Sequence, residues 1–256
     1  FTTVFILLIG QRKKLMADVC YLWKHKRQFF SLMAAAFFIS INWYIYIWAV
    51  THDRVLESSM GYYINPIISV VFGMIFFKEK LSRPTIVALF IALLGVLVMT
   101  INYGQVPWAS LLLALSFAIY GVLKKRIVLD ATRGLAIETL FILPFALMYY
   151  VYLYMNHSMQ FLHEGWQTDV LMMISGIITA IPLILFAKGA QIIPMYLLGF
   201  IQYVSPTITF LLGVFLYHEP FTEVEAIAFG CIWTAIAIFS YSSILEAKKR
   251  HTVQVK

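Results

Sequence analysis

Eight long apolar stretches follow one another along this chain, and they constrain its fold more than any other feature. A helix needs roughly 20 mainly apolar residues to cross the ~30 Å hydrocarbon layer of a membrane. The stretches cover residues 29–50, 56–77, 84–101, 107–123, 134–155, 169–187, 194–217 and 222–245. Residues 1–9 are also apolar but cover only about half a membrane at ~1.5 Å per residue, so we expect them to end a ninth helix.

The composition excludes an ordinary soluble domain. Hydrophobic residues make up 62% of the 256 residues and charged residues only 12%. Soluble domains are about 45–50% apolar and about 25% charged. Pro84, Pro107 and Pro194 stand at the starts of three stretches, where a missing N–H costs little. We therefore predict an all-α membrane protein.

The basic residues predict how the helices are oriented. Lys and Arg gather in cytoplasmic loops. Placing 10–28 in the cytoplasm and alternating sides puts 18 of the 19 Lys and Arg residues there, with Arg54 outside. The net charge of +7 is then an orientation signal, and we expect no nucleic-acid partner. The C-terminus is expected in the cytoplasm. A cytoplasmic N-terminus requires one more helix before 1–9, so we expect about ten helices in the intact protein, with the first and part of the second absent here.

A motif recurs at an interval of 140 residues. The shared pattern is Y-[IV]-[NS]-P-x2-[ST]-x3-G-x5-E, which begins at Tyr63 and Tyr203 and ends at Glu79 and Glu219. The charge count makes 56–77 run inward and 194–217 run outward, so the two copies are inverted. Inverted repeats of this kind build many secondary transporters, which bind substrate near the membrane midplane. We predict two five-helix bundles, with residues 1–103 as the first repeat and 104–256 as the second.

Each copy of the motif places small and polar residues on one helical stripe, because residues three or four apart share a face. The two stripes are Tyr62, Pro66, Ser69 and Gly73, and Gln202, Pro206, Thr209 and Gly213. Two interpretations stay open at this point. Small residues allow helices to pack closely, whereas polar residues and mid-helix prolines can line a solute cavity.

Few ionisable residues fall inside the apolar stretches. Glu138 lies about one turn into 134–155 and is either a proton- or cation-binding group or a carboxylate paired with Lys124, Lys125 or Arg133. Glu57, Glu79 and Glu219 lie at stretch ends, where we expect structural roles. Asn42 and Trp43 belong to an aromatic cluster in 29–50, which is either an interfacial belt or a ligand surface.

No signature of an enzyme or cofactor site is found. The chain lacks an HExxH motif, a phosphate-binding loop and a G-x-S-x-G motif. Cys20 and Cys231 have no metal-ligand spacing, and we expect no disulfide between them. We predict neither a cofactor nor a metal, and no enzymatic activity.

Several runs resemble the RarD group of EamA-type transporters, in the drug/metabolite transporter (DMT) superfamily. They are SINWYIYIWAV (40–50), LESSMGYYINP (56–66), SFAIYG (116–121), IETLFILP (137–144) and GFIQYVSPT (199–207). The resemblance covers almost the whole chain. It implies ten helices in two inverted EamA repeats, a central cavity and both termini in the cytoplasm.

Together these observations predict a secondary transporter of the bacterial inner membrane. It would export or exchange a small organic solute, such as an amino acid, metabolite or drug-like compound, by alternating access. The expected solute-binding residues are Asn42, Trp43, Tyr62, Asn65, Ser69, Gln202, Tyr203 and Thr209, with Glu138 as the coupling candidate. The expected partners are the solute, the bilayer and, for Glu138, protons, and a homodimer stays open. The alternatives are a membrane-embedded enzyme or lipid-handling protein, or a structural or signalling membrane subunit.

Overall fold

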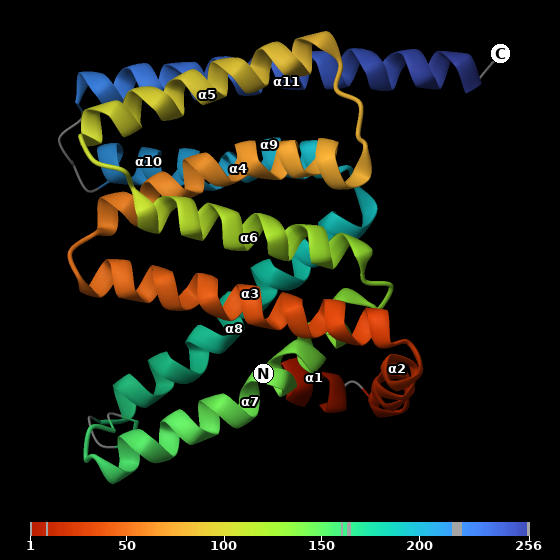
Figure 1. Ribbon diagram of the computed structural model, residues 1–256, viewed down its shortest axis with the longest axis vertical. Coiled ribbons are helices and arrows are strands. Elements are labelled where there is room, and N and C mark those ends of the chain that lie inside the picture. Colours follow the sequence, from red (N-terminus) through yellow and green to blue (C-terminus); the bar gives the residue numbers. More distant parts are fainter. Residues whose placement is uncertain (1, 9, 160, 163–164, 217–221, 255–256) are drawn as a thin grey trace. The chain divides into compact units, whose positions relative to one another are not determined.

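The computed structural model describes residues 2–8, 10–159, 161–162, 165–216 and 222–254, and every regular element in these ranges is a helix (Figure 1). Glu219 lies outside the described residues. The helices are α1 (Thr2–Leu8), α2 (Arg12–Lys24), α3 (Lys26–Thr51), α4 (Val55–Phe77), α5 (Arg83–Tyr103), α6 (Trp108–Arg126), α7 (Ala131–Met155), α8 (Trp166–Ile192), α9 (Met195–Gln202), α10 (Val204–Phe215) and α11 (Glu223–Gln254).

The predicted membrane spans are confirmed. Within the described residues, eight segments are long and apolar enough to cross a membrane, and each overlaps one of the predicted stretches. The prolines lie where the sequence analysis placed them. Pro84 is in the first turn of α5, Pro107 directly precedes α6, and Pro194 is the N-cap of α9. A proline at a helix start is tolerated because the first N–H groups of a helix have no partner within it.

Two segments differ from the prediction. Residues 10–28 were treated as a basic loop, but they contain helix α2, which buries Leu15 and Leu22. The stretch 194–217 was predicted as one helix, but it is interrupted by a turn at Tyr203 between α9 and α10. Pro206 gives a physical reason for the interruption: it cannot donate to the Gln202 carbonyl, and it lies in the first turn of α10.

The helix boundaries repeat with the same interval as the sequence motif. Adding 140 to the bounds of α3, α4 and α5 gives 166–191, 195–217 and 223–243. These ranges correspond to α8, to α9 with α10, and to the membrane part of α11. Three consecutive helices of the first half therefore have counterparts in the second half.

Two compact units make up the chain, and each draws on both halves of the sequence. Unit 1 comprises residues 1–40 and 119–192, and unit 2 comprises 41–118 and 193–256. The predicted division at residue 103 is thus a division of sequence, whereas these units are defined by contacts within the fold. The domain boundary at 103 stays a prediction.

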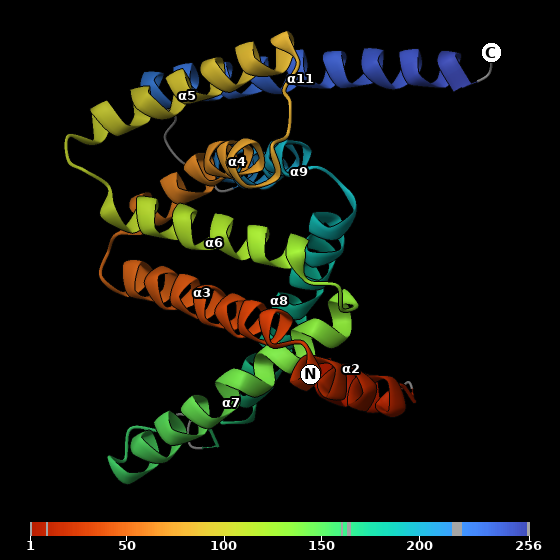
Figure 2. The same ribbon diagram turned by 45° about the vertical axis from the view of Figure 1, so that its right-hand side comes forward.

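In unit 2, α4 packs against its own repeat counterpart (Figures 1 and 2). The Tyr203 hydroxyl donates to the Tyr63 carbonyl at 3.3 Å, and these two tyrosines are counterparts in the repeat. Further along α4 the contacts move backwards along α9. A Cβ added at Gly199 would lie 3.4 Å from the Ser69 Cβ, and one added at Gly73 would lie 3.0 Å from the Met195 Cβ. The two helices are therefore antiparallel, as the inverted repeat predicted.

The second pair of counterparts in unit 2, α5 and α11, packs in the same way. Ser82 at the start of α5 lies 3.2 Å from Ser242 of α11, measured between hydroxyl oxygens, whereas Gly95 faces Ala228. A Cβ at Gly95 would come within 2.9 Å of the Ala228 carbonyl oxygen, so glycine permits this close approach. Ala88 and Ala228, which are repeat counterparts, are both fully buried.

Contacts between counterparts give unit 2 a local two-fold relation. In a two-fold arrangement every contact occurs twice, once in each orientation. A residue that lies on the axis therefore contacts its own counterpart. The Tyr63–Tyr203 contact has this property. The buried apolar cluster of unit 2 surrounds it and includes Ile64, Phe200 and Phe229. The axis of the repeat thus passes through the core of this unit.

Unit 1 contains α1, α2, α7 and α8 with the N-terminal part of α3 and the C-terminal part of α6. Helix α7 contacts α1, α2 and α8. Asp130 starts α7 as its N-cap, because its side chain accepts from the backbone N–H groups of Thr132 and Arg133. The arginine also binds Asp18 of α2 at 2.5 Å, which ties α2 to the start of α7.

Candidate functional site

A polar contact lies in unit 2 at the end of α9, where the stretch 194–217 is interrupted. Asn65 of α4 donates through Nδ2 to Oε1 of Gln202, the last residue of α9. The Gln202 amide in turn donates to the Leu198 carbonyl at 3.3 Å. Tyr203, in the turn itself, is 2% exposed and donates to Tyr63. Three of the predicted site residues, namely Asn65, Gln202 and Tyr203, are thus brought together.

This cluster has more hydrogen-bond acceptors than donors. Asn65 is 7% exposed, and its Oδ1 atom has no hydrogen-bond partner among the described residues. A buried acceptor without a partner costs free energy, so it marks a place where a donor is missing. The prolines add to the imbalance, because Pro66 and Pro206 cannot donate to the carbonyls of Tyr62 and Gln202.

The predicted aromatic residues of α3 and α4 form a separate series in unit 2. The Trp43 ring meets Tyr46 edge-on at 6.1 Å, and Tyr46 meets Tyr62 at 6.4 Å. Trp43 and Tyr62 are 38% and 50% exposed. The neighbouring Asn42 is engaged elsewhere, since its Nδ2 donates to the Leu113 carbonyl at 2.8 Å and to the Ser116 hydroxyl at 2.9 Å.

The remaining two predicted binding residues lie in different surroundings. Ser69 is 1% exposed and packs toward Gly199 of α9. Thr209 is exposed on α10. On α4 the stripe of Pro66, Ser69 and Gly73 is therefore a packing surface against α9, and only its end at Tyr62 is open.

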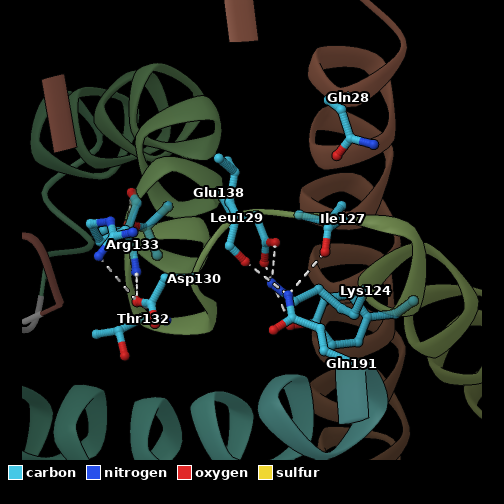
Figure 3. A network of polar contacts seen from close by, with 12 residues as sticks. Gln28, Lys124, Ile127, Leu129, Asp130, Thr132, Arg133, Glu138 and Gln191 are labelled. Atoms are coloured by element: carbon cyan, nitrogen blue, oxygen red, sulfur yellow. Dashed lines mark hydrogen bonds and ion pairs between the residues drawn. The ribbon is translucent and has the colours of Figure 1, made fainter. Parts of the chain in front are cut away.

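A second polar site lies in unit 1 and contains the coupling candidate Glu138. The Lys124 ammonium donates to Glu138 Oε1 at 2.6 Å, and the two side chains are 0% and 2% exposed (Figure 3). Tyr120 donates to Oε2 of the same carboxylate at 3.5 Å. Of the three partners predicted for Glu138, Lys124 is the one it binds, and the pair is buried. Lys124 is therefore more than an orientation signal.

Two glutamines fix the connection between α6 and α7, and Figure 3 shows the contacts of one of them, Gln191. Gln191 of α8 donates to the carbonyls of Ile127 and Leu129 at 3.1 and 2.8 Å. Gln28 of α3 accepts from the Val128 N–H at 3.2 Å and donates to a carbonyl at the end of α6. Sequence reasoning did not single out either glutamine. The available signal was a polar amide at the end of an apolar stretch.

Two further glutamates have structural roles, as expected. Glu79 accepts from the N–H groups of Met195 and Tyr196 at 2.8 and 3.0 Å, so it caps the start of α9. Glu57 is 1% exposed and binds Arg54 at 3.0 Å, the Tyr103 hydroxyl at 2.7 Å and the N–H of Ala109 at 3.1 Å. It thus joins three helices of unit 2, which is more than a contact with a helix dipole.

In the part of the chain that the structure describes, no group of three or more His, Cys, Asp or Glu side chains is arranged to hold a metal ion. Cys20 and Cys231 are both free thiols. The site chemistry available is therefore hydrogen bonding at Asn65 and Gln202 and ion pairing at Lys124 and Glu138.

Comparisons with known proteins agree with this architecture. The EamA-like transporter family matches residues 1–101 and 106–241. The chain is 47% identical to "Uncharacterized transporter YojE" of Bacillus subtilis (strain 168), over 86% of this chain and 74% of that protein. It is 34% identical to "Protein RarD" of Escherichia coli (strain K12), over 91% of this chain and 81% of that protein.

A solved structure described as "Crystal structure of protein" shares the fold, with a TM-score of 0.58 and 18% sequence identity over 82% of this chain and 76% of that one. The family match covers most of the chain in two blocks, and the Bacillus subtilis relative carries a transporter name. The chain belongs to the EamA-like transporter family and is a multi-pass membrane transporter of the DMT type, related to RarD.

Proposed function

We propose that this protein is a secondary transporter of the bacterial inner membrane that exports or exchanges a small organic solute by alternating access. The observation that carries the proposal is the Asn65–Gln202 contact, at the place where an inverted helix pair meets and α9 is interrupted. Buried amides are expensive in a membrane unless they have partners. Transporters of inverted-repeat architecture place solute sites at such interruptions.

The unpartnered Asn65 Oδ1 supports a particular kind of contact with the solute. An acceptor is satisfied by an N–H or O–H group, so the solute would present a donor here. Gln202 and Tyr203 complete this part of the site. The aromatic series of Trp43, Tyr46 and Tyr62 offers flat surfaces for apolar or cationic parts of the solute. Asn42, Ser69 and Thr209 remain in the proposed set, with Thr209 exposed and Ser69 buried against α9.

Alternating access would use the two inverted sequence repeats, 1–103 and 104–256, as its two related halves. The antiparallel packing of α4 on α9 and of α5 on α11 supports this, because counterparts that meet across a two-fold axis can exchange environments. The basic residues support a cytoplasmic C-terminus.

Glu138 is proposed as the proton-coupling group. Its carboxylate is buried against Lys124 Nζ at 2.6 Å. Proton binding to the carboxylate would remove the counter-ion of a buried ammonium, which is costly in a low-dielectric interior. The pair would then separate, and protonation would be linked to a change of conformation. Intramembrane ionisable pairs of this kind often serve as proton relays.

Flux measurements in proteoliposomes test the proposal. A thermal-shift screen of amino acids, amines, nucleosides and sugars with the purified protein first selects a solute, and radiolabelled uptake then measures its flux. We expect Asn65→Ala and Gln202→Ala to reduce flux about tenfold or more, since each loses a hydrogen bond worth about 1–1.5 kcal/mol and leaves its partner unpaired.

Asn156→Ala is the matched control, because Asn156 is an exposed asparagine at the end of α7 that bonds its own helix. Its flux should equal that of the unsubstituted protein. Saturable flux that persists unchanged in both site variants would overturn the site assignment. Absence of saturable flux for every solute in the panel would overturn the transporter mechanism. For coupling, Glu138→Gln should abolish the dependence of flux on a proton gradient.

A further inference from the structure

We propose that unit 1 carries a binding site for the phosphate headgroup of an anionic phospholipid in the cytoplasmic leaflet. The site is a pocket between the first turns of α3 and the last turn of α6, lined by Arg27, Gln28, Ser31, Leu123 and Arg126. No acidic side chain is among these five lining residues. Two guanidinium groups, an amide and a hydroxyl are the donors that phosphate oxygens accept from.

The pocket is held in place by side-chain contacts. The Gln28 Nε2 atom donates to the Arg126 carbonyl at 3.1 Å, and its Oε1 atom accepts from the Val128 N–H at 3.2 Å. These two bonds fix the start of α3 against the end of α6. Arg27 follows Lys26 at the start of α3, and Arg126 follows Lys125 at the end of α6. The two arginines are thus positioned by the fold itself.

The surroundings of the pocket favour a lipid over a free phosphate ion. Phe30, Met33 and Phe37 of α3 are 57%, 41% and 57% exposed, and by helical spacing they share a side of the helix that is turned away from Gln28 and Ser31. From Arg27 to Phe37 the helix rises about 15 Å, which is half of the ~30 Å hydrocarbon layer. Helix α3 thus begins at a charged pocket and continues as exposed apolar surface over the depth of one leaflet, which matches an amphiphile with an anionic head and acyl chains.

The neighbouring segment has the composition of a membrane interface. Trp23, near the end of α2, is 64% exposed, and the Lys26 ammonium lies 4.9 Å from the centre of its ring. Trp and Lys gather at the level of the headgroups. The orientation derived from the basic residues places this segment on the cytoplasmic side, where basic pockets between membrane helices bind anionic headgroups.

The test measures lipid binding to the purified full chain in detergent, by native mass spectrometry and by the midpoint of thermal unfolding. The probes are phosphatidylglycerol, phosphatidylcholine and inorganic phosphate. We expect phosphatidylglycerol to bind and to raise the midpoint, whereas phosphatidylcholine and phosphate do not. The double variant Arg27→Gln/Arg126→Gln should bind phosphatidylglycerol about tenfold more weakly or worse, because two charge-assisted hydrogen bonds are lost.

The matched control is Lys13→Gln/Lys14→Gln, which removes the same charge from exposed positions of α2 that do not line the pocket. Its phosphatidylglycerol affinity should stay within about twofold of the unsubstituted protein, because exposed charges contribute little. Equal losses of phosphatidylglycerol affinity in both double variants would overturn the site. A rise of the unfolding midpoint with inorganic phosphate alone would also overturn it. If the pocket variant does not fold, Arg27→Lys/Arg126→Lys replaces it, and undiminished binding there overturns the assignment of the guanidinium groups.

Discussion

Breaking the buried Lys124–Glu138 pair should be far more damaging than removing it whole. At 2.6 Å, with an effective dielectric constant of about 20, the Coulomb attraction is about 6 kcal/mol. Burying the two ions costs several kcal/mol each, so the intact pair contributes little net stability. A single replacement removes the attraction but leaves one charge buried. We therefore expect Lys124→Met and Glu138→Gln each to lower the free energy of unfolding by about 3–5 kcal/mol.

The double variant Lys124→Met/Glu138→Gln leaves no uncompensated charge. Its free energy of unfolding should lie within about 2 kcal/mol of the unsubstituted protein, so the two single losses do not add. Reversible unfolding by SDS in mixed detergent micelles measures the free energy of unfolding of the unsubstituted protein, the two single variants and the double variant. Asp18→Asn provides the comparison, because the Arg133–Asp18 pair is 18% and 17% exposed, and breaking this partly buried pair should cost less than breaking the fully buried one.

Two results would refute this reasoning. Single variants that each cost less than about 1 kcal/mol would mean that water or lipid headgroups reach the site and compensate the remaining charge. Losses that add in the double variant would mean that the two side chains act independently. Either result would also remove the physical basis for linking protonation of Glu138 to a conformational change.

Three further perturbations follow from the packing of the helices. Gly199→Ala should destabilise the α4–α9 contact by about 1–3 kcal/mol, because its Cβ would lie 2.8 Å from the Pro66 carbonyl oxygen. Gly230→Ala, with open space around it, should be neutral or slightly stabilising. Equal thermal midpoints for the two variants would contradict this expectation. Glu79→Ala should cost about 1 kcal/mol through loss of the α9 cap, measured by SDS unfolding, and no change would argue against the capping role. Gln28→Ala should speed hydrogen exchange in peptides covering Val128, whose N–H it binds, and unchanged exchange there would show that the contact is not needed to protect it.

The helical spans and their inversion were accessible from the sequence, because hydropathy and loop charge act locally. The 140-residue interval recurs in the bounds of α3, α4 and α5 and of their counterparts. The break at Tyr203 was not foreseen. Pro66 lies inside the uninterrupted helix α4, whereas its counterpart Pro206 lies in the first turn of α10. The same residue type in the same repeat position gives two outcomes, so the motif alone does not decide between them.

The candidate site was only partly accessible. Asn65, Gln202 and Tyr203 were identified as polar members of the repeat, but their mutual contact depends on how α4 and α9 are rotated against each other. Glu138 was predicted to pair with one of three basic residues, and the fold selects Lys124. Arg133, which is closer in sequence, binds Asp18 instead. Such choices are made over distances of many residues, which no local pattern encodes.

By itself, the sequence determined that this chain is a bundle of membrane helices and that its second half repeats the first in inverted orientation, and it predicts which side most of its basic residues occupy. These properties depend on apolar length, on charge in short connections and on a recurring motif. The tertiary structure decided which side chains meet: Tyr63 with Tyr203 on the axis of the repeat, Asn65 with Gln202 at the helix break, and Lys124 with Glu138. The reason is that hydrogen bonds and ion pairs depend on ångström-scale distances, which are fixed only when whole helices pack.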